Sequence, residues 1–160
     1  MHGFYLRKMY LENKLVEPGA ISLDGVPIDL GRIEAPTYIL ATREDHIAPW
    51  KSVYAATGLY AGPVRFVLSA SGHIAGVVNP PAANKYGYWT NTRKPKDADA
   101  WLKGAKRHDG SWWRDWGRWV ARHAGPRTTP ARWPGGGRLK VIEDAPGTYV
   151  KVRAGVEALS

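Results

Sequence analysis

Two short runs of strand-forming residues constrain the fold of this chain more than any other feature. Residues 36–41 read PTYILA and residues 64–69 read VRFVLS, so the runs begin about 30 residues apart. The segment between them starts at Pro49, a suitable first helical residue, and places four residues at helical spacing: Trp50, Val53, Tyr54 and Thr57. A strand, a helix and a strand over this length predict a βαβ unit with parallel strands.

Near-continuous apolar strands are typical of a sheet that is covered on both faces. Two parallel strands do not make such a sheet by themselves. We therefore expect an α/β fold in which most of the partner strands lie on residues upstream of this chain.

A polar loop follows each of these strands, and each loop carries one residue of chemical interest. Asp45 follows the first strand and His73 follows the second. In parallel sheets the loops at the carboxyl ends of the strands build the active site. A carboxylate there can hold one imidazole nitrogen while the other takes a proton from a nucleophile. Acid before histidine, with the nucleophile upstream of both, is the chain order of α/β-hydrolases.

A purely structural interpretation of the same residues stays open. Asp45 precedes the predicted helix and can cap it, and His73 can be an ordinary loop histidine. Gly72 and Gly76 flank His73 and favour the catalytic interpretation, since glycines let backbone and substrate approach closely. His46 and Gly72 are candidates for supporting positions beside the pair. For His46 a partly buried structural role is the favoured alternative.

Local patterns predict further elements. Residues 4–15 predict a helix, residues 21–30 a small hairpin around an Asp-Gly turn, residues 99–107 another helix, and residues 139–142 a short last strand. Ser111 is a suitable N-cap for a helix that runs to about His123. Its spacing predicts an inner stripe of Trp112, Trp116, Trp119 and Val120, opposite a ridge of Arg114, Arg118 and Arg122.

Composition excludes several classes of protein. The 160 residues are 44% apolar and 23% charged, which is ordinary for one globular domain. Cysteine is absent, so disulfides, thiolate metal sites and a cysteine nucleophile are excluded within these residues. No run of about 18 apolar residues and no apolar N-terminal signal segment is present, so we expect a cytoplasmic protein without a membrane span.

The positive charge is concentrated in one stretch. Residues 85–140 hold fourteen Lys/Arg against four Asp/Glu, whereas residues 1–84 hold seven of each. Such an excess suggests nucleic acid, the phosphate groups of a ligand or an anionic surface as a partner, and a solvated arginine-rich face is the alternative. Five of the tryptophans in this stretch cluster within twenty residues (Trp101, Trp112, Trp113, Trp116 and Trp119), where they serve either as core or as a hydrophobic contact surface.

Five motifs follow one another along the chain: YLRKMYLENKL (5–15), REDHIAPW (43–50), ASGHIAGVVNPP (70–81), GSWW (110–113) and IEDAPGTYV (142–150). In this order they resemble the polyhydroxyalkanoate synthases, especially the class I poly(3-hydroxybutyrate) polymerases. The resemblance covers essentially the whole chain. It implies the C-terminal fragment of the catalytic domain of such an enzyme.

The resemblance implies polymerisation of (R)-3-hydroxyacyl-CoA into a polyester with release of CoA, by a Cys-His-Asp triad on an α/β-hydrolase core. Asp45 matches the family's catalytic aspartate and His73 its catalytic histidine. His73 would activate the cysteine thiol, and Asp45 would orient His73 or help to activate the attacking 3-hydroxyl. The family's cysteine lies upstream in a Gly-x-Cys-x-Gly elbow that this chain lacks, so the isolated chain is predicted to be inactive.

The resemblance also implies an organisation and partners. Residues 1–83 would end the α/β-hydrolase core with its Asp and His loops, and residues 84–160 would form a basic, Trp-rich helical extension that packs on it. A homodimer, association with polyester granules, and no metal or bound cofactor are expected. The alternatives are a related esterase or depolymerase with an upstream serine, and a nucleic-acid-binding module in residues 85–140, which is the less favoured.

Overall fold

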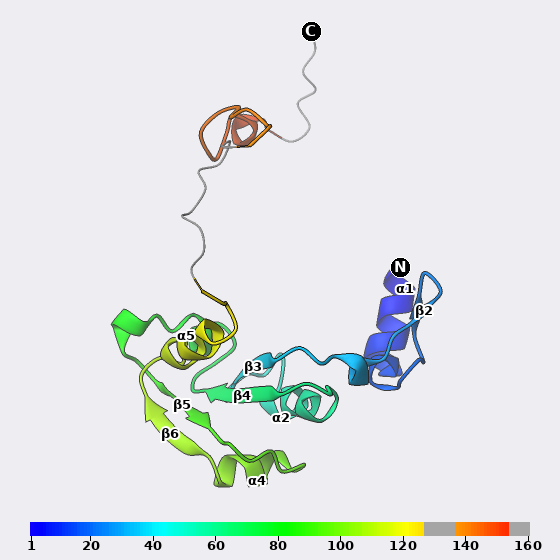
Figure 1. Cartoon of the computed structure of the whole chain (residues 1–160), viewed down its shortest axis with the longest axis vertical. Helices are drawn as coiled ribbons and strands as arrows, with labels where there is room; N and C mark the ends of the chain where they lie inside the picture. The colour runs from blue at the N-terminus through cyan, green and yellow to red at the C-terminus, as the bar shows by residue number, and fades with distance from the viewer. Residues whose placement is uncertain (127–136, 154–160) are drawn as a thin grey trace. The chain divides into compact units, whose positions relative to one another are not determined.

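The computed structural model describes residues 1–126 and 137–153, and the chain divides into two compact units, Met1–Ala124 and Gly125–Ser160. The first unit contains a four-stranded sheet in the order β3-β4-β5-β6 (Figure 1). The strands are β3 (Thr37–Thr42), β4 (Val64–Ser69), β5 (Gly87–Thr90) and β6 (Lys106–Asp109). β3 and β4 are parallel, whereas β4–β5 and β5–β6 are antiparallel pairs.

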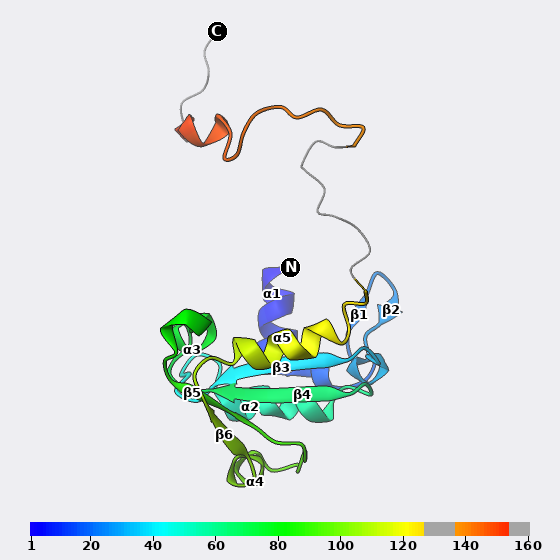
Figure 2. The same ribbon diagram turned by 60° about the vertical axis from the view of Figure 1, so that its left-hand side comes forward.

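The predicted βαβ unit is confirmed. Helix α2 (Trp50–Ala55) connects the two parallel strands, and a 3₁₀ turn, Ala56–Gly58, ends it. Figure 2 shows α2 on one face of the sheet and α5 (Trp113–Ala121) on the other. The sheet is therefore covered on both faces and the fold class is α/β, as the apolar strands predicted.

Each face of the sheet has its own core, because strand side chains alternate between the faces. On the α2 side, Phe66 and Leu68 pack with Trp50, Tyr54 and the fully buried Trp101. On the α5 side, Val67 packs with Tyr88 and Trp112. The indole of Trp101 thus belongs to the core, as the core interpretation of the tryptophans predicted.

The stretch after residue 83 contains two strands that the sequence did not predict. The predicted helix over residues 99–107 is shorter, because α4 (Ala98–Lys103) stops at Gly104 and Lys106–Asp109 pairs with β5 instead. Residues 139–142 do not form the predicted strand, and that prediction was wrong. The extension is therefore not purely helical, since β5 and β6 complete the same sheet as β3 and β4.

The N-terminal predictions are confirmed in outline. α1 (His2–Tyr5) continues as a π-helical segment, Leu6–Leu11, and a 3₁₀ turn, Lys14–Val16, follows. The hairpin consists of β1 (Ser22–Leu23) and β2 (Val26–Pro27), an antiparallel pair. Further 3₁₀ turns lie at Leu30–Arg32, Pro81–Ala83 and Tyr149–Lys151. None of the helices in the described residues is both long and apolar enough to span a membrane.

Helix α5 presents most of the predicted stripe to the sheet, because Trp112 is buried and Trp119 and Val120 are half-buried, but Trp116 departs from the prediction. Asp115, not Trp116, is buried, and Trp113 and Trp116 are 40% and 36% exposed. Asp115 accepts two hydrogen bonds from the Arg65 guanidinium, at 2.7 and 2.5 Å, and one from the Tyr38 hydroxyl at 3.0 Å. A partly buried ion pair therefore fixes the helix on the sheet. The arginine ridge of Arg114, Arg118 and Arg122 is exposed, as expected.

Burial disfavours the charged form of Asp115, but the hydrogen bonds and charge of Arg65 outweigh it and lower the pKa of the carboxyl group. Burial, together with the adjacent Asp115 charge, raises the pKa of Tyr38. The carboxylate is thus ionised and the phenol is neutral, which is the protonation pattern that the three hydrogen bonds require.

Asp115→Asn is expected to destabilise the fold by about 2 kcal/mol, because it leaves Arg65 without its counter-charge in a half-buried site. Asp109→Asn is the matched control, since the Asp109 side chain is 83% exposed and, among the described residues, pairs with Arg107 alone. That change should cost less than about 0.5 kcal/mol. Urea midpoints of both variants and the parent measure the difference, and equal midpoints would contradict a stabilising role for Asp115.

Candidate active site

The two loops of interest are held together by an extension of the parallel ladder. β3 and β4 pair in register up to Thr42 and Ser69. Beyond the strands, the Arg43 amide donates to the Ser69 carbonyl at 2.8 Å and the Glu44 amide donates to the Ser71 carbonyl at 3.0 Å. The first residues of both loops therefore lie side by side at one edge of the sheet.

The predicted acid and histidine meet at this edge. The distance from His73 Nδ1 to Asp45 Oδ2 is 2.8 Å. The other carboxylate oxygen, Oδ1, accepts the backbone N–H groups of Ile47 and Ala48, each at 2.9 Å, so the loop itself fixes the acid. The Asp45 side chain is 8% exposed and the His73 side chain is 45% exposed.

Hydrogen bonding keeps Asp45 ionised. The Ala48 amide and then the His73 ring are the main causes that lower the pKa of Asp45 to about 2. An ionised carboxylate can only accept, so Nδ1 of His73 must carry a hydrogen. The remaining ring nitrogen, Nε2, has no hydrogen-bond partner among the described residues and keeps its lone pair when the ring is neutral. The pair is therefore arranged to take a proton at Nε2.

A short helix, α3 (Ala75–Val78), follows His73 and packs tightly against the strands. The amide of Gly76 donates to the carbonyl of Gly72 at 2.9 Å, and the hydroxyl of Ser69 donates to the carbonyl of Gly76 at 2.9 Å. A Cβ on Gly76 would lie 2.5 Å from the Ala70 carbonyl oxygen and 2.6 Å from Cγ2 of Thr42. Only glycine fits here, so this position fixes the turn behind His73.

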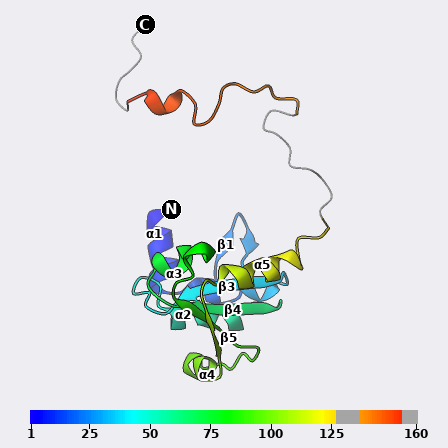
Figure 3. The ribbon, with the colours of Figure 1, turned by 90° about the vertical axis from the view of Figure 1, so that its left-hand side faces the viewer.

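The indole N–H groups of two tryptophans donate hydrogen bonds to the carbonyls at the C-terminal end of the same helix. Trp112 Nε1 donates to the carbonyls of Gly76 and Val77, at 3.2 and 3.0 Å. Trp113 Nε1 donates to the carbonyls of Val77 and Val78, at 3.3 and 3.1 Å. Figure 3 shows α3 beside the start of α5. Sequence reasoning did not assign this role to the two tryptophans, because their hydrogen bonds cross 35 residues or more of chain.

The other candidate residues fall in different places. Gly72 contributes its carbonyl to α3, while His46 is exposed and forms no hydrogen bond with Asp45 or His73 in the described residues. His108 lies on β6 and its Nε2 is 2.8 Å from the hydroxyl of Thr90. Among residues 1–126 and 137–153, His, Cys, Asp and Glu side chains form no group of three or more that could hold a metal ion.

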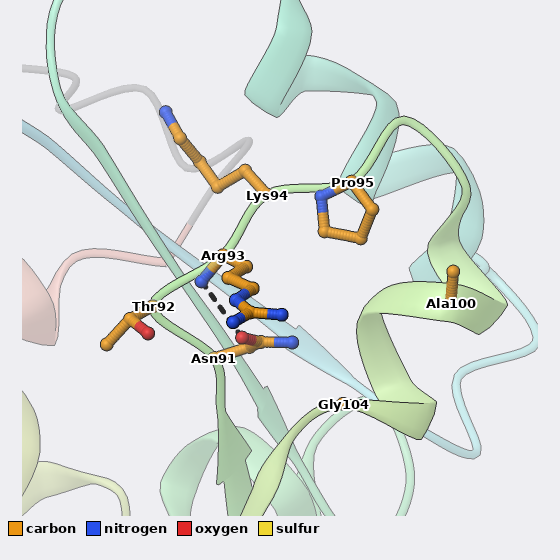
Figure 4. A pocket seen from close by; sticks show the side chains of 7 residues that line it. All are labelled: Asn91, Thr92, Arg93, Lys94, Pro95, Ala100 and Gly104. Carbon is orange, nitrogen blue, oxygen red and sulfur yellow. Dashed lines mark hydrogen bonds between the residues drawn. The ribbon is translucent and has the colours of Figure 1, made fainter.

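A cavity of about 610 Å³ lies apart from the Asp45–His73 pair. Figure 4 shows it between the loop after β5 and helix α4, with the Arg93 amide bonded to Asn91 Oδ1 at 2.9 Å. β5 runs antiparallel to β4, so this loop lies at the edge where β4 begins, opposite to the edge that carries His73. The cavity therefore does not belong to the candidate active site.

The two loops thus bring an acid and a histidine into contact at the carboxyl ends of two parallel strands, and the sequence contains no cysteine. No family model matches the sequence. The chain is 54% identical over 152 residues to the "Poly(3-hydroxyalkanoate) polymerase subunit PhaC" of Cupriavidus necator, with 94% of this chain and 26% of that protein covered. It is 53% identical over 153 residues to the protein of the same name from Rhizobium meliloti, with 96% and 24% covered.

A "Poly(3-hydroxyalkanoate) polymerase" of Methylorubrum extorquens is 46% identical over 154 residues, with 96% of this chain and 25% of that protein covered. The chain is thus homologous to poly(3-hydroxyalkanoate) polymerases along almost its entire length, and the resemblance predicted from its motifs is confirmed. It spans about a quarter of the length of these relatives.

The two glycines that flank His73 are expected to differ sharply on substitution. Gly76→Ala should destabilise the fold by about 1–3 kcal/mol, because its Cβ overlaps backbone and a buried methyl group. Gly72→Ala should be close to neutral, since the nearest atom to its Cβ is the Glu44 carbonyl oxygen at 4.0 Å. Urea denaturation compares the two, and equal effects would mean that α3 does not pack as described.

The pKa of Asp45 should rise in His73→Ala but stay below its ordinary value of 3.8, because the Ala48 amide is the larger cause of the shift. Since the folded-state pKa is lowered, ionised Asp45 stabilises the fold above about pH 4. This stabilisation is lost as the pH falls toward 2. Carboxyl ¹³C titration by NMR measures both proteins, and an unchanged midpoint would show that His73 does not contact the acid in solution.

Proposed function

We propose that this chain supplies the acid–histidine part of a poly(3-hydroxyalkanoate) polymerase, an acyltransferase that converts (R)-3-hydroxyacyl-CoA into polyester and free CoA. The observation that carries the proposal is the 2.8 Å contact between His73 Nδ1 and Asp45 Oδ2, at the carboxyl ends of two parallel strands. The homology to named polymerases supports the same reaction class.

In the proposed reaction a cysteine thiol, which this sequence lacks, loses its proton to Nε2 of His73. The thiolate attacks the thioester carbonyl, an acyl–cysteine bond forms, and CoA leaves as a thiol with the proton from His73. The 3-hydroxyl of the next unit then attacks the acyl carbonyl. Its proton again passes to His73, the ester bond forms, and the cysteine leaves as thiolate and recovers that proton.

The geometry favours orientation of His73 as the role of Asp45. Oδ1 is occupied by the amides of Ile47 and Ala48, and Oδ2 by the His73 ring and, at 3.3 Å, the Thr42 hydroxyl. The carboxylate is also 8% exposed, which leaves little room for a substrate hydroxyl. Asp45 therefore acts through His73 in both half-reactions, and activation of the 3-hydroxyl falls to His73 as well.

The proposal extends to partners and location. The hydrophobic product offers a surface for the exposed indoles of Trp113 and Trp116, which supports contact with a polyester granule in the cytoplasm. A homodimer is proposed by analogy with the synthase family. No bound cofactor takes part in the proposed reaction, because CoA arrives with each substrate and leaves with each addition.

The test grafts this chain into the Cupriavidus necator polymerase in place of the 152 matching residues. Release of CoA from (R)-3-hydroxybutyryl-CoA is expected from the graft and not from the 160-residue chain alone, which has no cysteine. In the graft, His73→Gln should reduce the rate roughly 10²–10⁴-fold, because the proton acceptor is lost. His2→Gln, on exposed α1, is the matched control and should leave the rate unchanged.

Asp45→Asn in the graft separates the two roles of the acid. If Asp45 orients His73, single-turnover acylation of the cysteine and later chain elongation should slow by similar factors. Asp109→Asn controls for the loss of one surface carboxylate. Slower elongation with normal acylation would contradict the orienting role, and full activity of His73→Gln would overturn the proposed function itself.

A further inference from the structure

A basic cleft lies between helix α5 and the sheet, away from the Asp45–His73 pair. Its volume is about 300 Å³, and it is lined by Arg65, Thr90, His108, Asp115, Arg118, Trp119 and Arg122. Arg65 precedes the end of β4 by four residues, which at about 3.3 Å per residue places the cleft roughly 13 Å along the strand from Ser69. The proposed polymerase reaction makes no use of these residues.

Asp115 is the one acid among the described residues that line the cleft, and it is already paired. Both oxygens of Asp115 accept from Arg65, and Oδ2 also accepts from Tyr38. Arg118 approaches the same carboxylate only to 3.8 Å and is 68% exposed. Within residues 1–126 and 137–153 no carboxylate forms an ion pair with Arg122. Three guanidinium groups (Arg65, Arg118 and Arg122) therefore line the cleft against one carboxylate, and the described lining carries an excess of positive charge.

The spacing and surroundings of these arginines suit an anion. Arg118 and Arg122 are four residues apart on α5 and the turn that ends it, so both point to the same side. His108 also lines the cleft, and burial, followed by the charge of Lys106, lowers the pKa of its ring against the opposing effect of the Asp115 charge. The charges of Arg118 and Arg65 also lower the pKa of His108. A neutral imidazole beside Thr90 adds hydrogen-bonding capacity without adding a competing carboxylate.

We propose that this cleft is a binding site for the phosphate groups of a small ligand, held by the guanidinium groups of Arg118 and Arg122. Guanidinium presents a planar fork of N–H donors that matches phosphate oxygens in bidentate fashion. The cleft is concave and small, whereas a nucleic-acid surface is an extended basic track with stacking aromatics along it. This site is independent of the proposed polymerase function, because it shares no residue with the Asp45–His73 pair.

The test is calorimetric titration of the 160-residue chain at low salt with diphosphate, ADP and adenosine. Diphosphate and ADP should bind and adenosine should not. Arg118→Gln/Arg122→Gln should weaken both at least tenfold, whereas Arg114→Gln/Arg107→Gln should bind as the parent does. The control removes the same charge, from one residue of α5 and one of β6 that do not line the cleft.

NMR of His108 gives a second, local readout. A bound phosphate adds negative charge beside the ring, so the pKa of His108 should rise with diphosphate in the parent and not in Arg118→Gln/Arg122→Gln. Equal loss of affinity in both double variants would show that binding depends on the net charge of the protein and not on Arg118 and Arg122, and it would overturn the proposal. Binding of adenosine, or tight binding of single-stranded DNA with no change at His108, would overturn it too.

Discussion

The parallel pairing of β3 with β4, continued past Thr42 and Ser69 by two backbone hydrogen bonds, is the constraint on which the site depends. A strand pair of this kind delivers two loops to the same edge whatever their sequences are. Strand pairing fixes the spacing of the two backbones at about 4.8 Å, but it does not fix the distance between two side chains in the loops that follow. The Ile47 and Ala48 amides make the finer adjustment, because they hold one carboxylate oxygen and leave the other for His73.

Sequence reasoning located this part of the structure because its signals are local. All of these signals lie within about 40 residues of sequence: the two apolar runs, Pro49, and Asp45 followed by His73. β6 was missed for the opposite reason. Lys106–Asp109 is a run of four polar residues with no apolar alternation, and it becomes a strand only by pairing with β5, which in turn pairs with β4. Tertiary pairing overrides propensity there.

The orientation of α5 shows that local sequence is also insufficient to predict which face of a helix packs on the sheet. Four apolar residues at helical spacing predicted the inner face, and three of them are buried or half-buried, yet Asp115 is buried where Trp116 was expected and Trp116 is exposed. The reason is Arg65, a charged residue that β4 directs toward the helix and that requires a counter-charge. Its partner lies 50 residues away, so no window of sequence contains both. The roles of Gly76 and Trp112 were out of reach for the same reason, since their contacts join β3, α3 and α5.

The position of His73 sets a condition on the rest of the proposed enzyme. A thioester intermediate must be shielded from water, or hydrolysis competes with chain elongation. Here the His73 side chain is 45% exposed, and the apolar side chains of Ile74 and Val78 beside it are 72% and 56% exposed. The chain thus holds the His73 ring through its hydrogen bond with Asp45 but leaves the ring accessible to solvent. On the proposed function, the segment that brings the thiol to Nε2 must also cover Ile74 and Val78. The same segment would then supply the nucleophile and exclude water from the thioester.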